Sequence, residues 1–179
     1  MGLVVSILAE DFDSLARRAL AAVPSADLIE LRLDRLINVD EKQLARLIAQ
    51  LALPVIVAVN GPEAFGTFTG SAAERFAVLE RGARAGAAFI DIDWRQARAL
   101  QSLPGSTRRI VSRHEKQSAK SPAELHTELR ASLREGDQAK LVVEARDGVA
   151  ALEILALLKA APGDLIASYG LNTSADGRG

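Results

Sequence analysis

The chain has 179 residues, of which 49% are hydrophobic and 25% are charged, and its net charge is −1. This balance offers no electrostatic basis for binding nucleic acid or an acidic membrane surface, and the absence of cysteine excludes disulfides and thiolate metal sites. We expect one globular domain, residues 1–179, with a core of its own and a cytoplasmic location.

Seven short apolar runs alternate along the chain with longer segments that have helical spacing. The first run has no basic segment before it and is followed at once by Glu10 and Asp11, so it predicts a strand and not a signal peptide. No apolar run reaches the roughly 18 residues that a membrane helix needs. The expected strands are residues 3–9, 28–34, 54–60, 89–93, 109–114, 139–144 and 164–169.

Residues typical of helix starts stand between these runs. Ser71 with Glu74 and Ser121 with Glu124 have the spacing of capping boxes, and Pro122 stands at the first helical position of the second one. Two aspartates are further candidates for N-caps, namely Asp40 and Asp147. The strands are therefore expected to alternate with helices.

Alternation of strands and helices predicts a parallel sheet covered by helices, either an open doubly wound sheet or a closed β/α barrel. No G-x-G-x-x-G turn follows the first strand, so nothing indicates a dinucleotide site. A strand spacing of about 25 to 30 residues suits the barrel, which has eight units. We expect an α/β fold of the TIM (β/α)8 type that is incomplete, with about seven strands and no C-terminal unit.

Charged residues occur inside the expected strands, where side chains alternate between two faces. In residues 28–34 the apolar positions would meet the helices, so Glu30, Arg32 and Asp34 would point to the barrel interior. The same alternation turns these residues of the later strands inward: Asp91, Asp93, Ser112, His114, Lys140 and Glu144. Barrel active sites form at the carboxyl ends of several strands, so these side chains are candidates for a site.

A lysine and a histidine on adjacent inner strands suggest a specific chemistry. A lysine in an apolar, partly cationic pocket has a lowered pKa and can form an imine with a ketone. A histidine within reach can then take a proton from the neighbouring carbon and return one to a leaving hydroxyl, which gives a β-elimination of water. Lys140 and His114 would be this pair. Glu30 would orient the histidine or receive its proton charge, and Arg32 would hold a polar or anionic substrate.

Each of these residues also has a purely structural interpretation. Lys140 would be a strand-entry lysine whose amine reaches solvent, and His114 a strand-end histidine with a backbone partner. Glu30 and Arg32 would neutralise each other. The aspartates of residues 89–93 would be caps or hydrogen-bond acceptors, and His126 would be an exposed helical residue.

Five motifs in the right order resemble those of the type I 3-dehydroquinate dehydratases. They are IELRLD at 29–34, similar to an E-x-R-x-D strand; FIDID at 89–93, with Asp93 in place of a glutamate; IVSRH at 110–114; SPAEL at 121–125; and AKLVV at 139–143. The resemblance covers roughly residues 3–167.

The resemblance implies a role for each matching residue. Lys140 matches the Schiff-base lysine, His114 the general acid/base, and Glu30 and Arg32 residues of the substrate pocket. It implies the dehydration of 3-dehydroquinate to 3-dehydroshikimate, the third step of the shikimate pathway. It also implies a small-molecule substrate, a covalent imine through Lys140 without metal or cofactor, and a homodimer as one arrangement, since members are often dimers.

The chain departs from the family pattern after the third strand and at its C-terminal end. Asn60 stands where the family has a pocket arginine, and Glu63 is one place removed from the family's glutamate. Without that guanidinium, the chain would bind a carboxylate substrate more weakly. Arg178 falls one residue out of register with another arginine of the family. The resemblance nevertheless makes Asn60 and Arg178 the expected substrate-binding positions in these two regions. Residues 171–179 form a polar tail unlike the family.

These departures leave more than one function open. The first hypothesis is the dehydratase itself. The second is a catalytically impaired or non-enzymatic descendant, a barrel kept as a binding or scaffold domain. A third is another Schiff-base lyase or an aldolase, in which the same lysine would act on a different oxygenated substrate.

Overall fold

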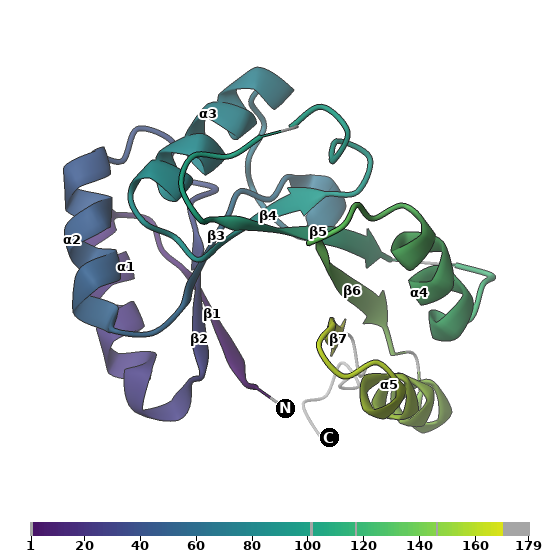
Figure 1. The fold of residues 1–179 in the computed structure, drawn as a ribbon. Coiled ribbons are helices and arrows are strands. Elements are labelled where there is room, and N and C mark those ends of the chain that lie inside the picture. The colour runs from purple at the N-terminus through teal and green to yellow at the C-terminus, as the bar shows by residue number, and fades with distance from the viewer. Residues whose placement is uncertain (1, 101, 117, 146, 170–179) are drawn as a thin grey trace. The chain divides into compact units, whose positions relative to one another are not determined.

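A computed structural model describes residues 2–100, 102–116, 118–145 and 147–169 (Figure 1). The chain divides into two compact units, Met1–Ile110 and Val111–Gly179, and each is described by itself. Strand β5 (Arg108–Glu115) begins in the first unit and ends in the second. In both units strands alternate with helices, as the sequence predicts, except that within the described residues β5 follows β4 (Phe89–Asp93) without a helix between them.

In the first unit, four strands lie side by side in chain order, and each neighbouring pair is parallel. The elements are β1 (Val4–Leu8), α1 (Phe12–Ala22), the short helix η1 (Val23–Ser25), β2 (Leu28–Arg32), α2 (Glu41–Leu51), β3 (Val55–Ala58), the short helix η2 (Pro62–Ala64), α3 (Ala72–Arg84) and β4 (Phe89–Asp93). Asp11, Asp40 and Ser71 cap the three α-helices by accepting backbone N–H groups.

Strand register sorts the side chains of the first unit into two faces. Leu31, Val57 and Ile90 form one row across β2, β3 and β4, and all three are fully buried. This row faces the helices, because Val57 lies directly against Gly82 of α3. The next row, on the opposite face, holds Arg32 and Asp91.

The second unit holds the end of β5, α4 (Pro122–Ala131), β6 (Gln138–Glu144), α5 (Gly148–Ala160) and β7 (Leu165–Tyr169). In sheet order β6 lies between β5 and β7, and it pairs with β7 in parallel. Leu125 and Leu129 of α4 are each 1% exposed and form the apolar side of this helix. Ser121 closes a capping box with Glu124 at its start.

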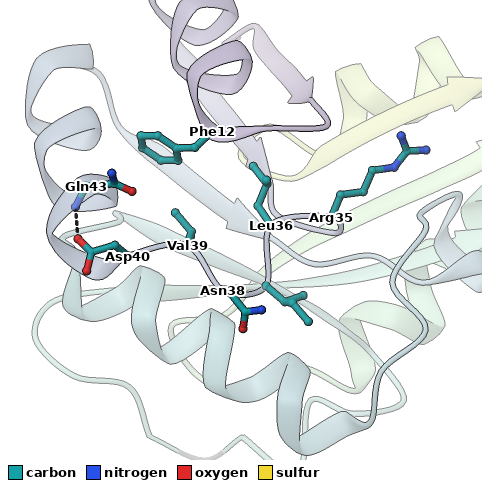
Figure 2. A pocket seen from close by; sticks show the side chains of 8 residues that line it. Phe12, Arg35, Leu36, Asn38, Val39, Asp40 and Gln43 are labelled. Atoms are coloured by element: carbon teal, nitrogen blue, oxygen red, sulfur yellow. Dashed lines mark hydrogen bonds between the residues drawn. The ribbon is translucent and has the colours of Figure 1, made fainter.

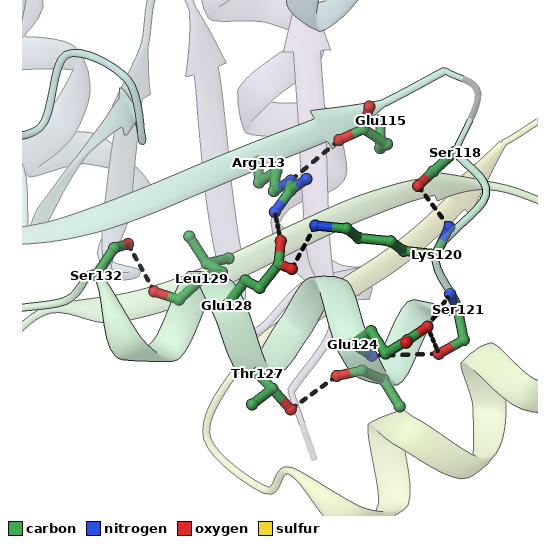
Figure 3. A network of polar contacts seen from close by, with 11 residues as sticks. Arg113, Glu115, Ser118, Lys120, Ser121, Glu124, Thr127, Glu128, Leu129 and Ser132 are labelled. Carbon is green, nitrogen blue, oxygen red and sulfur yellow. Dashed lines mark hydrogen bonds and ion pairs between the residues drawn. The ribbon is translucent and has the colours of Figure 1, made fainter.

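A charged network ties α4 to β5 within the second unit (Figure 3). The guanidinium of Arg113 donates to Glu115 and to Glu128, each at 3.0 Å, and the amine of Lys120 contacts Glu128 at 2.5 Å. The Arg113 side chain is only 10% exposed, so this pairing offsets the cost of burying a cation between the strand and the helix.

The expected strands and caps are confirmed. Each strand lies within two residues of its expected bounds, and the capping boxes at Ser71 and Ser121 and the N-caps at Asp40 and Asp147 are all present. The expectation for His126 is wrong. Its side chain is 13% exposed, and its Nε2 lies 2.7 Å from Oδ2 of Asp164, just before β7.

Among the residues that the structure describes, no helix has both the length and the apolar character to cross a bilayer. The extent of the domain, residues 1–179, stays a prediction.

Replacing Gly82 by alanine tests how closely α3 packs on β3. An added Cβ would lie 2.8 Å from Cγ1 and 2.9 Å from Cβ of Val57, contacts that require the helix to move. Overpacking costs about 1–3 kcal/mol, while alanine recovers about 1 kcal/mol of helix propensity. We therefore expect the Gly82→Ala variant to lose up to about 2 kcal/mol of unfolding free energy in urea denaturation.

Gly148→Ala at the start of α5 is the matched control, because no atom lies within 4 Å of its added Cβ. Its unfolding free energy should equal or slightly exceed that of the unsubstituted chain. Equal or greater stability of Gly82→Ala would contradict the close packing of α3 on Val57.

Candidate active site

Buried carboxylates surround one arginine at the carboxyl ends of the strands in the first unit. Glu30 is 4% exposed, Asp91 is 2% exposed and the side chain of Asp34 is fully buried. Arg32 donates from Nε to Oδ1 of Asp34 at 3.1 Å and from Nη2 to Oδ2 at 2.5 Å. This two-point contact fixes the plane of the guanidinium.

The electrostatics of Arg32 follow from these neighbours. Burial acts to lower its pKa, but the hydrogen bonds and charge of Asp34, together with the charges of Glu30 and Asp91, outweigh burial and raise the pKa. Arg32 therefore stays protonated. The interpretation that it only neutralises Glu30 is incomplete, because its two-point ion pair is made with Asp34.

Asp34 also fixes the position of Asn60, two residues beyond the end of β3. Its Oδ1 accepts the backbone N–H of Asn60 at 2.9 Å. The carbonyl of Asn60 accepts the backbone N–H of Phe68 at 3.0 Å, and an added Cβ on Gly66 would lie 1.9 Å from that carbonyl oxygen. The loop after β3 thus folds back closely on Asn60, which is 6% exposed.

Asp93, at the end of β4, serves as a turn acceptor. Its Oδ1 accepts the backbone N–H of Arg95 at 2.8 Å, and its Oδ2 lies 3.4 Å from the Arg95 guanidinium. Burial raises the pKa of Asp93 and the charge of Glu63 adds to this effect, while the contacts with Arg95 and the charge of Arg75 oppose it. The structural interpretation of Asp93 as a hydrogen-bond acceptor is confirmed.

Sequence reasoning missed an ion pair between Glu63 of η2 and Arg75 of α3. Nη1 of Arg75 lies 2.9 Å from Oε1 of Glu63, and the Arg75 side chain is 9% exposed. Burial acts to raise the pKa of Glu63, but its hydrogen bonds and the charges of Arg75 and Arg95 outweigh burial and lower it. Arg75 lies on the same side of α3 as the buried Val78 and Gly82. A charged residue on the apolar side of a helix indicates a buried ion pair, and this pattern was visible in the sequence.

His114 and Lys140 belong to the second unit, on neighbouring strands. On β5, Arg113 points toward Glu128 of α4, so alternation turns the 7% exposed His114 to the opposite face. On β6, Leu141 is fully buried and Lys140 half-buried, so Lys140 also lies on the face away from the apolar packing. By this alternation, the side chains of Lys140 and His114 lie on the same face of two adjacent strands.

Arg178, expected to bind substrate, lies outside the residues that the structure describes. Within those residues, no group of three or more histidine, cysteine, aspartate or glutamate side chains is arranged to hold a metal ion.

A hollow of about 360 Å³ lies in the first unit, along the segment that joins β2 to α2 (Figure 2). Its lining runs from Arg35 through Asp40, with Phe12 of α1 and Gln43 of α2. Asp40 is committed to capping α2 by accepting the Gln43 N–H at 2.9 Å, and Arg35 contacts Glu10 and Thr67. None of the sequence-predicted site residues lines this hollow.

The family model and the curated relatives indicate one family. A model of the type I 3-dehydroquinase family matches residues 3–178. The 3-dehydroquinate dehydratase of Methanothermobacter thermautotrophicus is 36% identical over 145 residues, which is 80% of this chain and 64% of that protein. The 3-dehydroquinate dehydratase of Methanococcus maripaludis strain C5 is 25% identical over 169 residues, 91% of this chain and 76% of that protein.

Solved structures show the same fold. The 3-dehydroquinate dehydratase of Geobacillus kaustophilus aligns with a TM-score of 0.70 at 20% identity, covering 89% of this chain and 68% of that one. The enzyme from Enterococcus faecalis aligns with a TM-score of 0.68 at 20% identity, covering 96% and 81%.

These likenesses confirm the α/β fold of the TIM-barrel type, with seven parallel strands in the described part of the chain. The chain spans 64% of the length of its Methanothermobacter relative. The family-model match over residues 3–178 decides the assignment. The chain belongs to the type I 3-dehydroquinase family.

Proposed function

We propose that this chain dehydrates 3-dehydroquinate to 3-dehydroshikimate through an imine formed on Lys140. The proposal is supported by strand alternation, which turns Lys140 of β6 and His114 of the neighbouring strand β5 to the same face. Family membership supplies the substrate class. No cofactor enters the reaction as proposed, because the lysine itself provides the electron sink.

The reaction begins with addition of the Lys140 amine to the substrate ketone, and loss of one water leaves a protonated imine. His114 removes a proton from the adjacent carbon, and the electron pair of that bond flows toward the imine nitrogen to give an enamine. The enamine expels the β-hydroxyl, which leaves as water with the proton that His114 returns. A further water hydrolyses the imine, so the lysine is regenerated and the net change is loss of one water.

Substrate-binding roles are proposed for the residues that match the family's pocket. Arg32 stays cationic and is held in one plane by Asp34, so it is suited to bind a polar or anionic substrate group. Glu30 supplies a buried carboxylate that acts on the charge of Arg32. Asn60 and Arg178 are proposed as further contacts, Asn60 with an amide in place of the family's guanidinium.

A specific observation favours a second candidate, a ligand-binding descendant without turnover. Asn60 takes the place of an arginine, and its backbone is fixed by Asp34 and Phe68. If this loss abolished productive binding, the chain would bind hydroxylated carboxylates without converting them. Turnover that depends on Lys140 separates the two candidates.

Borohydride trapping tests the imine directly. Incubation with 3-dehydroquinate and borohydride should add the mass of one reduced ligand to the chain, and peptide mapping should place it on Lys140. The Lys140→Met variant should give no adduct and no detectable turnover. Lys120→Met is the control, because Lys120 lies in the same unit but pairs with Glu128. A folded, unsubstituted chain that forms no adduct would reject the dehydratase proposal.

Replacing His114 should separate imine formation from elimination. The His114→Gln variant keeps the lysine, so borohydride should still trap an adduct on Lys140. Without the proton carrier, kcat should fall about 10²- to 10⁴-fold, the usual contribution of general acid–base catalysis. Steady-state kinetics and intact-mass analysis measure the two effects. A kcat within about threefold of the unsubstituted chain would show that another group moves the proton.

A further inference from the structure

Consecutive residues at the end of β5 point to opposite faces. Arg113 and Glu115 lie on the face toward α4, where Nε of Arg113 donates to Oε2 of Glu115 at 3.0 Å. Figure 3 shows the guanidinium of Arg113 directed at Glu128 of α4. His114 stands between Arg113 and Glu115 in sequence, so its imidazole is turned to the other face. The contacts on the α4 side therefore act on the same short piece of backbone that carries the imidazole.

One carboxylate of α4 holds both ends of the loop that follows β5. Oε2 of Glu128 accepts from Nη1 of Arg113 at 3.0 Å, before the loop. Oε1 of Glu128 lies 2.5 Å from the amine of Lys120, which directly precedes the cap of α4. Arg113 thus joins two carboxylates, one on its own strand and one on the helix, and the helix carboxylate is held from both sides.

Burial distinguishes these ion pairs from ordinary surface contacts. The Arg113 side chain is only 10% exposed, so its charge depends on the two carboxylates that it contacts. Hydrogen bonds from Lys120 and Arg113 lower the pKa of Glu128 and outweigh the opposing effect of burial, so its carboxylate is ionised at neutral pH. The strand and the helix are therefore joined by oppositely charged groups in a defined geometry.

We propose that Arg113 is a positioning residue for His114, because its ion pairs with Glu115 and Glu128 hold the end of β5 against α4 and thereby fix the direction of the imidazole. The inference rests on the proposed function, since it concerns the proton-transfer step of that reaction. Catalytic groups tolerate little displacement, and a shift of about 1 Å can cost about 100-fold in rate. The competing explanation is that the network only stabilises the packing of α4.

Kinetics that separate the two chemical steps test this role. Arg113→Gln should slow the elimination, which depends on His114, and leave imine formation on Lys140 intact. We therefore expect kcat to fall about 10- to 100-fold, while KM and the yield of the borohydride adduct stay nearly unchanged. Arg113→Lys keeps a cation on the same face, so it should recover part of the lost kcat.

Arg130→Gln is the matched control, because Arg130 ties the same helix to Asp164, before β7, at 3.1 Å. It removes an ion pair of α4 without touching β5, so its kcat should equal that of the unsubstituted chain. Urea denaturation measures the loss of stability in both variants. An unchanged kcat in folded Arg113→Gln, or an equal fall in Arg130→Gln, would overturn the inference, while an adduct on Lys140 would leave the dehydratase proposal intact.

A spectroscopic measurement tests the position of His114 without turnover. The chain has two histidines, so after selective ¹³C labelling the ring signal of His114 is the one that His114→Gln lacks. Arg113→Gln should broaden this signal, because the ring then samples several orientations, and Arg130→Gln should not. A signal of unchanged width in folded Arg113→Gln would overturn the inference even in a chain that forms no adduct.

Glu128→Gln tests the same tie from the helix and covers the case in which Arg113→Gln does not fold. The Glu128 side chain is 44% exposed, and its loss leaves Arg113 paired with Glu115. Its kcat should fall in the same direction but less, with the adduct yield kept and the His114 signal broadened. An unchanged kcat together with an unchanged signal width would overturn the assignment.

Discussion

The structure depends on the alternation of side chains along each β-strand. Successive residues point to opposite faces of the sheet, and helices cover one of these faces. Once Leu31 and Val57 pack toward the helices, the residues beside them in sequence must point to the other face. That face holds charged groups, which are costly to bury unless they are paired. The pairing of Arg32 with Asp34 meets this requirement in the first unit, and it also leaves a cation in a defined orientation.

Regular elements were largely predictable from the sequence because they depend on local pattern. All seven strands and the caps at Ser71, Ser121, Asp40 and Asp147 follow from periodicity and from residue types near each end. Tertiary partners were not predictable in this way. Periodicity places a residue on a face of its own element, but it does not say which residue of another element stands opposite.

The missed contacts illustrate this limit. Asp164 partners His126 across 38 residues, and Glu63 of η2 partners Arg75 of α3. Each of these pairs joins two different parts of the chain, so neither partner follows from the pattern of its own element.

The central claim is that alternation places position 114 of β5 and position 140 of β6 on one face. The chain has no cysteine, so paired cysteine substitutions and a short thiol-specific cross-linker measure this directly. Positions 114 and 140 should cross-link, as should the control pair 113 and 128, whose native side chains meet at 3.0 Å. The pair 113 and 140 should not. Cross-linking of 113 with 140, and none of 114 with 140, would contradict the account.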